Sequence, residues 1–299
     1  MADALWLSEF PEMERADLRA IRKALDGAYR DFSRAYGDQI ESFFDPLLSL
    51  LIGFEHLLLT TPWWLVILVI SAISYLASRS IKLCLGVAIA FFAIGYFGMW
   101  EDTMQTMSII LVCTLLAIAI GVPVGILMAR SNRLQSLLTP ALDVMQTMPA
   151  FVYLIPVVML LGIGRIPGVI AVIIYAIPPV IRLTNLGIRL VDKDVLEAAT
   201  AFGAGYLKRL TSVQLPLALP TIMAGINQTI MMALSMVVVA SMIGVKGLGQ
   251  PVLKSITNQY FTLGLLNGLA IVVLAIVFDR ISQSYAHRSQ RHLQRAQHD

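Results

Sequence analysis

The side chains that could do chemistry in this sequence are mostly uncharged, and they stand inside long apolar stretches. Six of them form two groups, namely Gln146, Thr147, Asn227, Gln228, Thr229 and Ser235. In apolar surroundings, amides and hydroxyls either hydrogen-bond to a neighbouring helix or contact a polar solute that crosses the membrane. Because these groups carry no charge, they suit a small zwitterion that must not be held tightly. Helix packing and a translocation pathway are both open interpretations of them.

Prolines, aromatic residues and methionines accompany these groups. Proline has no backbone N–H, so a carbonyl loses its hydrogen-bond donor at Pro149, Pro156 and the pair 178–179. Within a membrane such a carbonyl is tolerated where other protein groups or a watery cavity can bond to it. The nearby aromatic residues are Phe151, Tyr153 and Tyr175. Aromatic faces attract a quaternary ammonium group, although core packing is the alternative role for each ring. Met148 and Met236 could belong to an adaptable gate or could simply fill the core.

Several kinds of chemistry are missing from the sequence. No G-x-x-x-x-G-K-[ST] pattern occurs, so the chain does not bind ATP through a P-loop of its own. The centres of the apolar stretches lack the ionisable residues of an ion-coupled carrier, because Asp143, Arg182 and Asp279 stand near the ends. Cys84 and Cys113 have no neighbours at metal-ligand spacing, so we expect no metal and no cofactor. We therefore expect a partner subunit to supply the energy.

The composition identifies the elements that must carry these residues. Of the 299 residues, 58% are hydrophobic and 14% charged, with a mean hydropathy of +0.77, which excludes a water-soluble enzyme or a nucleic-acid-binding domain. The sequence predicts an all-α membrane protein with seven spans, which are Trp63–Ser78, Ile81–Met99, Thr103–Ala129, Leu138–Leu161, Ile166–Leu183, Leu217–Ile243 and Leu263–Ile281. Basic residues follow the first, third, fifth and seventh spans, which predicts an N-out, C-in orientation. An eighth span at Leu47–Leu59 is the alternative, but thirteen residues rise only about 20 Å, so we interpret this segment as interfacial.

The spans divide the chain into a tail, a membrane domain and a short basic end. Residues 1–62 form the predicted extracytoplasmic tail, with an apolar helical face made by Leu18, Ile21, Leu25, Tyr29, Phe32 and Tyr36. This amphipathic helix could be solvated, lie on lipid headgroups or pack on the membrane domain. Residues 63–283 form the membrane domain, and the basic residues 284–299 are expected to contact lipid headgroups in the cytoplasm.

The connection at residues 187–216 is the one predicted cytoplasmic loop long enough to hold structure of its own. Asp194 and Glu197 have the spacing of a capping box, which predicts a helix over 195–202 that ends at Gly203 and Gly205. A second short helix is predicted from Tyr206 to Gln214. On spacing alone, Glu197 is simply a capping partner and the glycines form a turn.

The residue types in this loop give it a second meaning. The matching residues are Glu197-Ala198-Ala199, Gly203, Leu215 and Pro216, with Val213 where the pattern has isoleucine. The loop resembles the EAA loop of ATP-binding-cassette importer permeases, E-A-A-x3-G-x9-I-x-L-P. That resemblance implies a coupling helix that sits in a cleft of a cytoplasmic ATPase. Small side chains at 198 and 199 suit close contact with a foreign surface.

Four more segments resemble the permease of the glycine betaine/proline betaine importers, namely Met145–Pro156, Tyr175–Leu183, Pro220–Thr229 and Ala233–Val238. The resemblance implies a type I importer permease in a bacterial inner membrane, paired with a second copy of itself. It also implies an ATPase subunit that binds ATP and Mg²⁺, and an extracytoplasmic substrate-binding protein. Choline, carnitine and trimethylamine N-oxide are alternative solutes. A self-sufficient secondary transporter is the rival class, but the sequence shows neither inverted repeats nor a buried ionisable pair.

Overall fold

The part of the chain that the computed structural model describes, residues 13–295, consists of helices and short connections without strands, which confirms the predicted all-α class. Side chains are described there except at 38, 41 and 287–295. The first twelve residues of the predicted tail and residues 296–299 of the basic end lie outside the described residues. The α-helices are α2 (Arg15–Thr60), α3 (Trp63–Ser78), α4 (Ile81–Tyr96), α5 (Trp100–Arg130), α6 (Asn132–Thr147), α7 (Ala150–Leu161), α8 (Arg165–Ala176), α9 (Pro178–Arg189), α10 (Lys193–Ala201), α11 (Tyr206–Arg209), α12 (Leu215–Ala240), α13 (Gly249–Asn258) and α14 (Phe261–Arg295).

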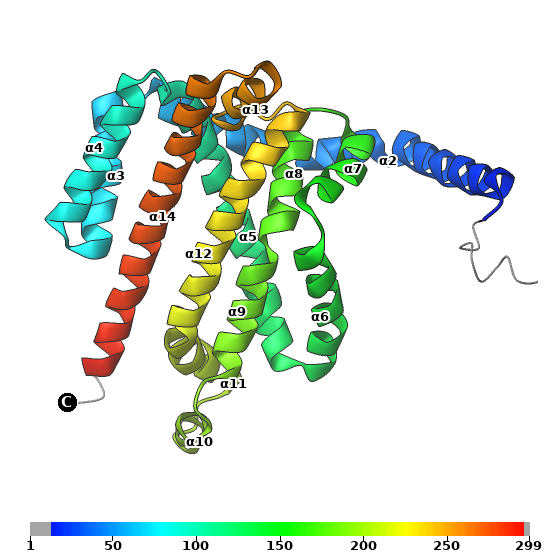
Figure 1. Cartoon of the computed structure of the whole chain (residues 1–299). Coiled ribbons are helices and arrows are strands. Elements are labelled where there is room, and N and C mark those ends of the chain that lie inside the picture. The colour runs from blue at the N-terminus through cyan, green and yellow to red at the C-terminus, as the bar shows by residue number, and fades with distance from the viewer. Residues whose placement is uncertain (1–12, 296–299) are drawn as a thin grey trace, which may run out of the picture.

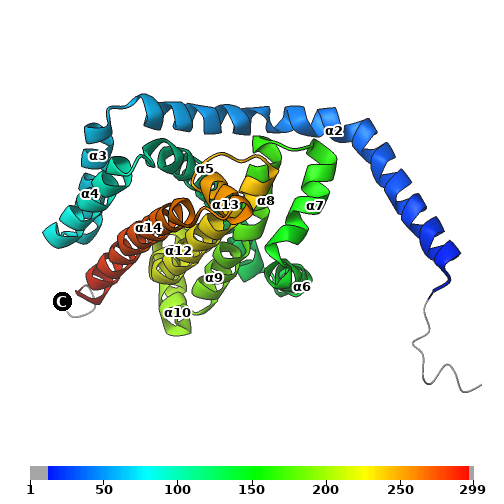
Figure 2. The ribbon, with the colours of Figure 1, turned by 45° about the horizontal axis from the view of Figure 1, so that its top comes forward.

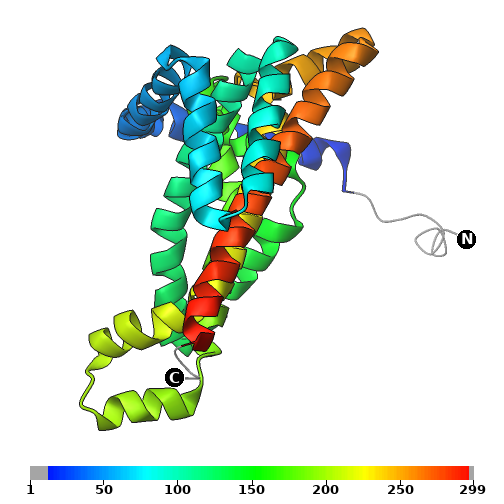
Figure 3. The same cartoon turned by 90° about the vertical axis from the view of Figure 1, so that its left-hand side faces the viewer.

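The helices of the bundle run back and forth between two ends of the molecule (Figure 1). The successive passages are made by α3, α4, α5, α6 with α7, α8 with α9, α12 and α14. Segment α10–α11 and the last turns of α14 lie at one end, while α2 and α13 lie at the other (Figures 1 and 3). The loop that the sequence places in the cytoplasm and the C-terminal helix thus share one end of the bundle.

The helices differ in their capacity to cross a bilayer. Among the described residues, five segments are long and apolar enough, and they are Ser42–Thr60, Trp100–Arg130, Arg165–Arg189, Tyr206–Ile243 and Phe261–Ala286. The bent pair α6–α7 is a sixth candidate. Helices α3 and α4 have 16 residues each and rise about 24 Å, less than a hydrocarbon core of about 30 Å. Their hairpin stops short of the end that α14 reaches (Figure 3). The count of seven spans and the N-out, C-in orientation remain predictions.

The predicted tail and the predicted interfacial segment form one continuous helix. Helix α2 runs from Arg15 to Thr60 even though Pro46 lies inside it, and it crosses one end of the bundle (Figure 2). Its N-terminal half extends past α7, away from the other helices (Figure 2). Most of the apolar face predicted there is therefore exposed, and the exposed residues are Leu18, Ile21, Leu25, Phe32 and Tyr36.

The predicted span Leu138–Leu161 is not one continuous helix, and it corresponds to parts of two helices. Helices α6 and α7 meet at a break and are bent by 101° relative to each other. The cause is Pro149, which lacks an N–H and disfavours helical geometry in the residue before it. Met148 accordingly has extended backbone angles, φ −67° and ψ 132°.

Close backbone contacts join α5, α9 and α12. A Cβ atom added at Gly125 on α5 would lie 2.6 Å from Thr184 Cβ and 2.7 Å from the Ile181 carbonyl oxygen on α9. At Gly225 on α12, an added Cβ would meet the Pro179 carbonyl oxygen at 3.2 Å. Small residues of this kind let membrane helices approach closely, so these three helices form the frame of the bundle.

Candidate functional site

The break between α6 and α7 is stabilised by a side chain of α7. In an uninterrupted helix the amide of residue 149 would donate to the Met145 carbonyl, but Pro149 has no N–H. The Tyr153 hydroxyl donates a hydrogen bond to that same Met145 oxygen. Tyr153 is buried and packs edge-on against Tyr175, with ring centroids 5.7 Å apart. The tyrosine thus acts as the missing donor at the break.

The structure sorts the predicted pathway residues by exposure. Exposed positions are Gln146, Thr147, Phe151, Gln228 and Ser235. Partly buried positions are Met148, Tyr175 and Asn227. Buried positions are Tyr153, Thr229 and Met236. The exposed polar residues lie on α6, beside the break, and along α12. Phe151 is on the first turn of α7, so one aromatic face is open near that polar group.

Asn227 is engaged in a polar cluster between α12 and α14. Its amide nitrogen donates to Asp279 Oδ1 at 2.8 Å, and its amide oxygen accepts from Ser282 Oγ at 2.5 Å. Gln283 Nε2 also donates to Asp279 Oδ1, at 2.6 Å. Asp279, Ser282 and Gln283 recur at helical spacing in an otherwise apolar segment, which is the one signal of this cluster in the sequence. Asn227 therefore joins two helices.

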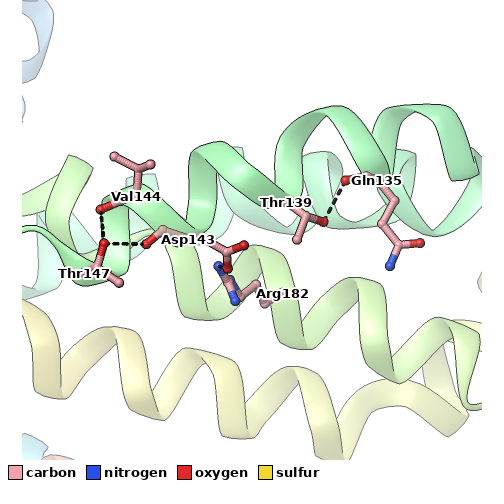
Figure 4. Close-up of polar contacts among 6 residues, drawn as sticks. All are labelled: Gln135, Thr139, Asp143, Val144, Thr147 and Arg182. Carbon is pink, nitrogen blue, oxygen red and sulfur yellow. Dashed lines mark hydrogen bonds and ion pairs between the residues drawn. The ribbon is translucent and has the colours of Figure 1, made fainter.

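Asp143 on α6 forms an ion pair with Arg182 on α9 (Figure 4). Both residues stand near the ends of predicted spans. They are 39 positions apart in the sequence, so nothing in the sequence indicated that they pair. Thr147, one turn after Asp143, donates its hydroxyl to the Asp143 and Val144 carbonyls at 3.1 and 3.2 Å (Figure 4). The Thr147 hydroxyl thus satisfies carbonyls in the last turn of α6, while the residue remains exposed.

Segment α10–α11 projects from one end of the bundle (Figures 1 and 3). Glu197 and Ala198 are exposed on α10, and Ala199 is partly buried. Gly203 has φ +79°, a left-handed conformation that suits glycine, which agrees with the predicted turn. Phe202, just before that turn, is 93% exposed.

The predicted capping box is wrong. Helix α10 begins at Lys193, and its N-cap is Asp192, whose side chain accepts from the Asp194 amide at 2.9 Å. Glu197 makes no capping hydrogen bond, since it lies a full turn inside the helix. Its carboxylate is consequently available to a partner.

The second helix of this loop does not end before Pro216. Helix α11 passes through a π-helical turn, Leu210–Gln214, into α12. The Leu215 amide donates to the Leu210 carbonyl, five residues back, and Pro216 follows in the first turn of α12. Segment α11, the π-helical turn and α12 therefore form one continuous helical path.

Two contacts hold the loop in place. Arg209 of α11 donates to the Thr200 hydroxyl of α10 at 3.1 Å. Arg130, at the end of α5, lies over the Tyr206 ring, 4.8 Å from its centroid, which is within cation–π range. The loop is therefore attached to the frame while its outer face remains open.

At the opposite end, α2 is fastened to α7 and α8. The Tyr29 hydroxyl donates to the Pro156 carbonyl at 2.5 Å, and Ser33 donates to the Leu160 carbonyl at 3.3 Å. Burial raises the pKa of Tyr29 above its ordinary value. Arg165 at the start of α8 pairs with Glu55 at 2.6 Å. Helix α2 is thus attached to α7 by hydrogen bonds and to the start of α8 by an ion pair.

Residues 121–291 match the family of binding-protein-dependent transport system inner membrane components. The chain belongs to this family. The matched region starts within α5 and ends within α14, so it contains the α6–α7 break and the α10–α11 loop. Helices α2, α3 and α4 precede the family match.

Individual family members are similar over most of the chain. The glycine betaine/proline betaine transport system permease protein ProW of Escherichia coli (strain K12) is 48% identical over 245 residues, 82% of this chain and 69% of that protein. The glycine betaine/carnitine transport permease protein GbuB of Listeria monocytogenes serotype 1/2a (strain 10403S) is 43% identical over 259 residues, 84% of this chain and 92% of that protein.

A solved structure shares the fold. A chain of the MetNI methionine ABC transporter, in an inward-facing conformation, superimposes with a TM-score of 0.56 at 19% identity, covering 62% of this chain and 93% of that chain. The predicted type I importer permease fold is thereby confirmed for this multi-pass membrane protein.

Proposed function

We propose that this chain is the permease subunit of an ATP-driven importer for glycine betaine or a closely related compatible solute. The observation that carries the proposal is the projecting α10–α11 loop, which presents Glu197, Ala198 and Phe202 at its surface. The same loop also exposes the apolar side chains of Val195, Tyr206 and Leu207. Several exposed apolar side chains on one projecting segment indicate a contact with another protein. Two relatives above 40% identity that are named for glycine betaine support the choice of solute.

The partners follow from the position of this loop. The end of the bundle that carries α10 faces the cytoplasm and receives an ATPase subunit, which binds ATP and Mg²⁺ and performs the hydrolysis. The end that carries α2 and α13 faces outward and receives a substrate-binding protein. Two copies of the chain form the pore in a bacterial inner membrane, with N-out, C-in orientation. Residues 187–216 are the coupling region, and Gly203, Leu215 and Pro216 shape its turn and its exit into α12.

The solute passes the exposed polar residues beside the break and along α12, which are Gln146, Thr147, Gln228 and Ser235. Phe151 offers an aromatic face to the quaternary ammonium group. Met148, Tyr175 and Asn227 are partly buried, and Tyr153, Thr229 and Met236 are buried, so these six residues contribute to the pathway through packing rather than by open contact with the solute. Weak uncharged contacts suit passage, because a tightly held solute would be released slowly.

The test is uptake of radiolabelled glycine betaine into proteoliposomes that hold this chain and its ATPase, with ATP inside and the binding protein outside. We expect ATP-dependent uptake that excess unlabelled betaine abolishes, and that unlabelled choline, carnitine and trimethylamine N-oxide reduce only weakly. If another of these solutes stimulates ATP hydrolysis while betaine stays outside, the assignment of glycine betaine as the solute is wrong. If hydrolysis never responds to a loaded binding protein, the importer assignment fails.

A matched pair of variants tests the coupling loop. Glu197→Gln and Asp194→Asn each remove one exposed carboxylate from α10. We expect Glu197→Gln to lose uptake while still reaching the membrane, and Asp194→Asn to keep most of it. A self-sufficient secondary transporter would instead keep transporting without ATP in both variants.

A further inference from the structure

Both ends of α6 are fastened to the same neighbouring helix by arginine side chains. At the start of α6, Arg189 of α9 donates to Asn132 Oδ1 at 2.8 Å. Near the end of α6, Arg182 of α9 pairs with Asp143 (Figure 4). Of the described α6 residues, Leu142 alone is buried. Leu142, with Leu134, Leu138 and Met145, packs on apolar residues of α5 and α9, and the two arginine contacts add a polar attachment near each end of α6.

The two arginines stand on one face of α9, because seven residues make two helical turns. Helix α9 ends at Arg189 and leads through residues 190–192 into α10. The helix that holds α6 is thus the helix that enters the coupling loop. A displacement of α10 reaches α9 across three residues.

The arginines differ in how completely they are bonded. Arg189 also donates from Nε to Asn185 Oδ1 and from Nη2 to the Met128 carbonyl, both at 2.9 Å. Its guanidinium is therefore fixed to α5, α6 and α9 together. Arg182 bonds through Nη2, while its Nε is buried with no partner among the described residues. Arg189 is the more completely bonded of the two arginines, while each of them makes one bond to α6.

We propose that Arg182, Arg189, Asp143 and Asn132 are positioning residues that make α6 move with α9 during the transport cycle. The inference rests on the proposed function, in which ATP hydrolysis acts on α10. Displacement of α9 then carries α6 with it, and the extended backbone at Met148 is the point where α6 changes position relative to α7. The C-terminal end of α6 bears the exposed residues 146 and 147, so the movement changes their position relative to Phe151 on the first turn of α7.

A purely structural role for the Asp143–Arg182 pair predicts something different. An unpaired charge near the membrane is costly, so breaking a structural pair lowers the amount of assembled permease and reduces uptake and hydrolysis together. A transmitting pair lowers the number of solute molecules carried per ATP hydrolysed. The ratio of uptake to hydrolysis therefore separates the two roles.

The first experiment compares Arg182→Gln with Arg133→Gln in the complete proteoliposome assembly. Arg133 is an exposed residue of α6 with no described partner, so its replacement removes the same charge without removing a contact. We expect Arg182→Gln to lower uptake per ATP by about tenfold, the upper range for residues that couple distant sites, with Arg133→Gln within about twofold of the unaltered permease. The double variant Asp143→Arg, Arg182→Asp should recover most of the loss. Equal ratios in the two single variants would overturn the proposal.

The second experiment leaves the four positioning residues unaltered. Spin labels at Leu137→Cys on α6 and Leu190→Cys after α9 occupy exposed sites, in assemblies where labelled copies are diluted with unlabelled ones. Cys84 and Cys113 are replaced by serine and alanine beforehand. We expect the distance between these labels to stay constant between nucleotide-free and ATP-bound states. A third label at Leu265→Cys on α14 should change its distance to α6.

The outcomes are separable. If α6 shifts relative to α9, or if α6 keeps its distance to both α9 and α14, the proposal is overturned even where the arginine variants do not assemble. If the unaltered assembly carries no solute with ATP, the proposed function has failed instead, which the same proteoliposomes report directly.

Discussion

Between α5 and α9 the backbones approach through glycines, whereas α6 is joined to α9 by long polar side chains beside an apolar contact. An added Cβ at Gly121 or Gly125 would collide with α9 at 2.4 to 2.7 Å. On the α6 side, Arg182 and Arg189 reach acceptors on α6, and Leu142 packs in the same apolar cluster as Ile181. The α5–α9 contact therefore depends on the absence of a side chain, and the α6–α9 attachment depends on polar groups that single substitutions can remove. The comparison distinguishes a glycine-packed frame from a helix that polar bonds attach to that frame.

The largest expected effect comes from breaking the frame. Gly125→Ala forces a Cβ against the Ile181 carbonyl oxygen, and overpacking of this kind costs about 1 to 3 kcal/mol or more. Gly268→Ala on α14 is the control, because nothing lies within 4 Å of its added Cβ. We expect the thermal unfolding midpoint of the purified permease to fall for Gly125→Ala alone. Equal midpoints would show that α5 and α9 are not packed as tightly as described.

The next effect comes from the polar cluster that joins α12 to α14. Asn227→Leu removes a donor to Asp279 and an acceptor for Ser282, which leaves a carboxylate with fewer partners and costs about 1 to 3 kcal/mol. Gln228→Leu replaces the neighbouring exposed amide, which has no described hydrogen bond, and should leave the unfolding midpoint nearly unchanged. If the two variants unfold alike, the cluster does not stabilise the frame.

A smaller effect is expected at the break between α6 and α7. Tyr153→Phe keeps the ring but leaves the Met145 carbonyl without its donor, at a cost of about 0.5 to 1.5 kcal/mol. Tyr175→Phe is the matched control, since the Tyr175 hydroxyl has no described hydrogen bond and the Tyr175 ring packs against the Tyr153 ring. Hydrogen exchange of the amides around residues 148–150 should rise in Tyr153→Phe alone. Unchanged exchange would mean that the break is held by packing.

The smallest effect is expected where α2 meets the start of α8. The Glu55–Arg165 pair is partly exposed, with side-chain exposures of 14% and 29%, so its coupling should be about 0.2 to 1 kcal/mol. A double-mutant cycle with Glu55→Gln and Arg165→Gln measures that coupling through the unfolding midpoint. Coupling well above this range would make α2 part of the frame.

Local sequence chemistry accounts for much of the molecule. Apolar runs of sufficient length predicted the membrane class and most helix positions, because a helix satisfies its own backbone in lipid. The pattern around Glu197 and Gly203 predicted a helix, a left-handed turn and a second helix, since these depend on neighbours within a few residues. Pro149 identified a freed backbone carbonyl, but the apolar run across Leu138–Leu161 predicted one span and not the break.

Tertiary structure decided the features that depend on which helices are neighbours. The sequence shows Asp143, Arg182, Asn227 and Asp279 as separate polar residues, and packing alone joins them across 39 and 52 positions. The same holds for Tyr153, for which the sequence left a solute contact and core packing both open, and whose hydroxyl the fold directs to the Met145 carbonyl. A sequence period specifies which face of a helix is polar, but the choice of partner depends on how closely the glycine-packed frame brings the helices together.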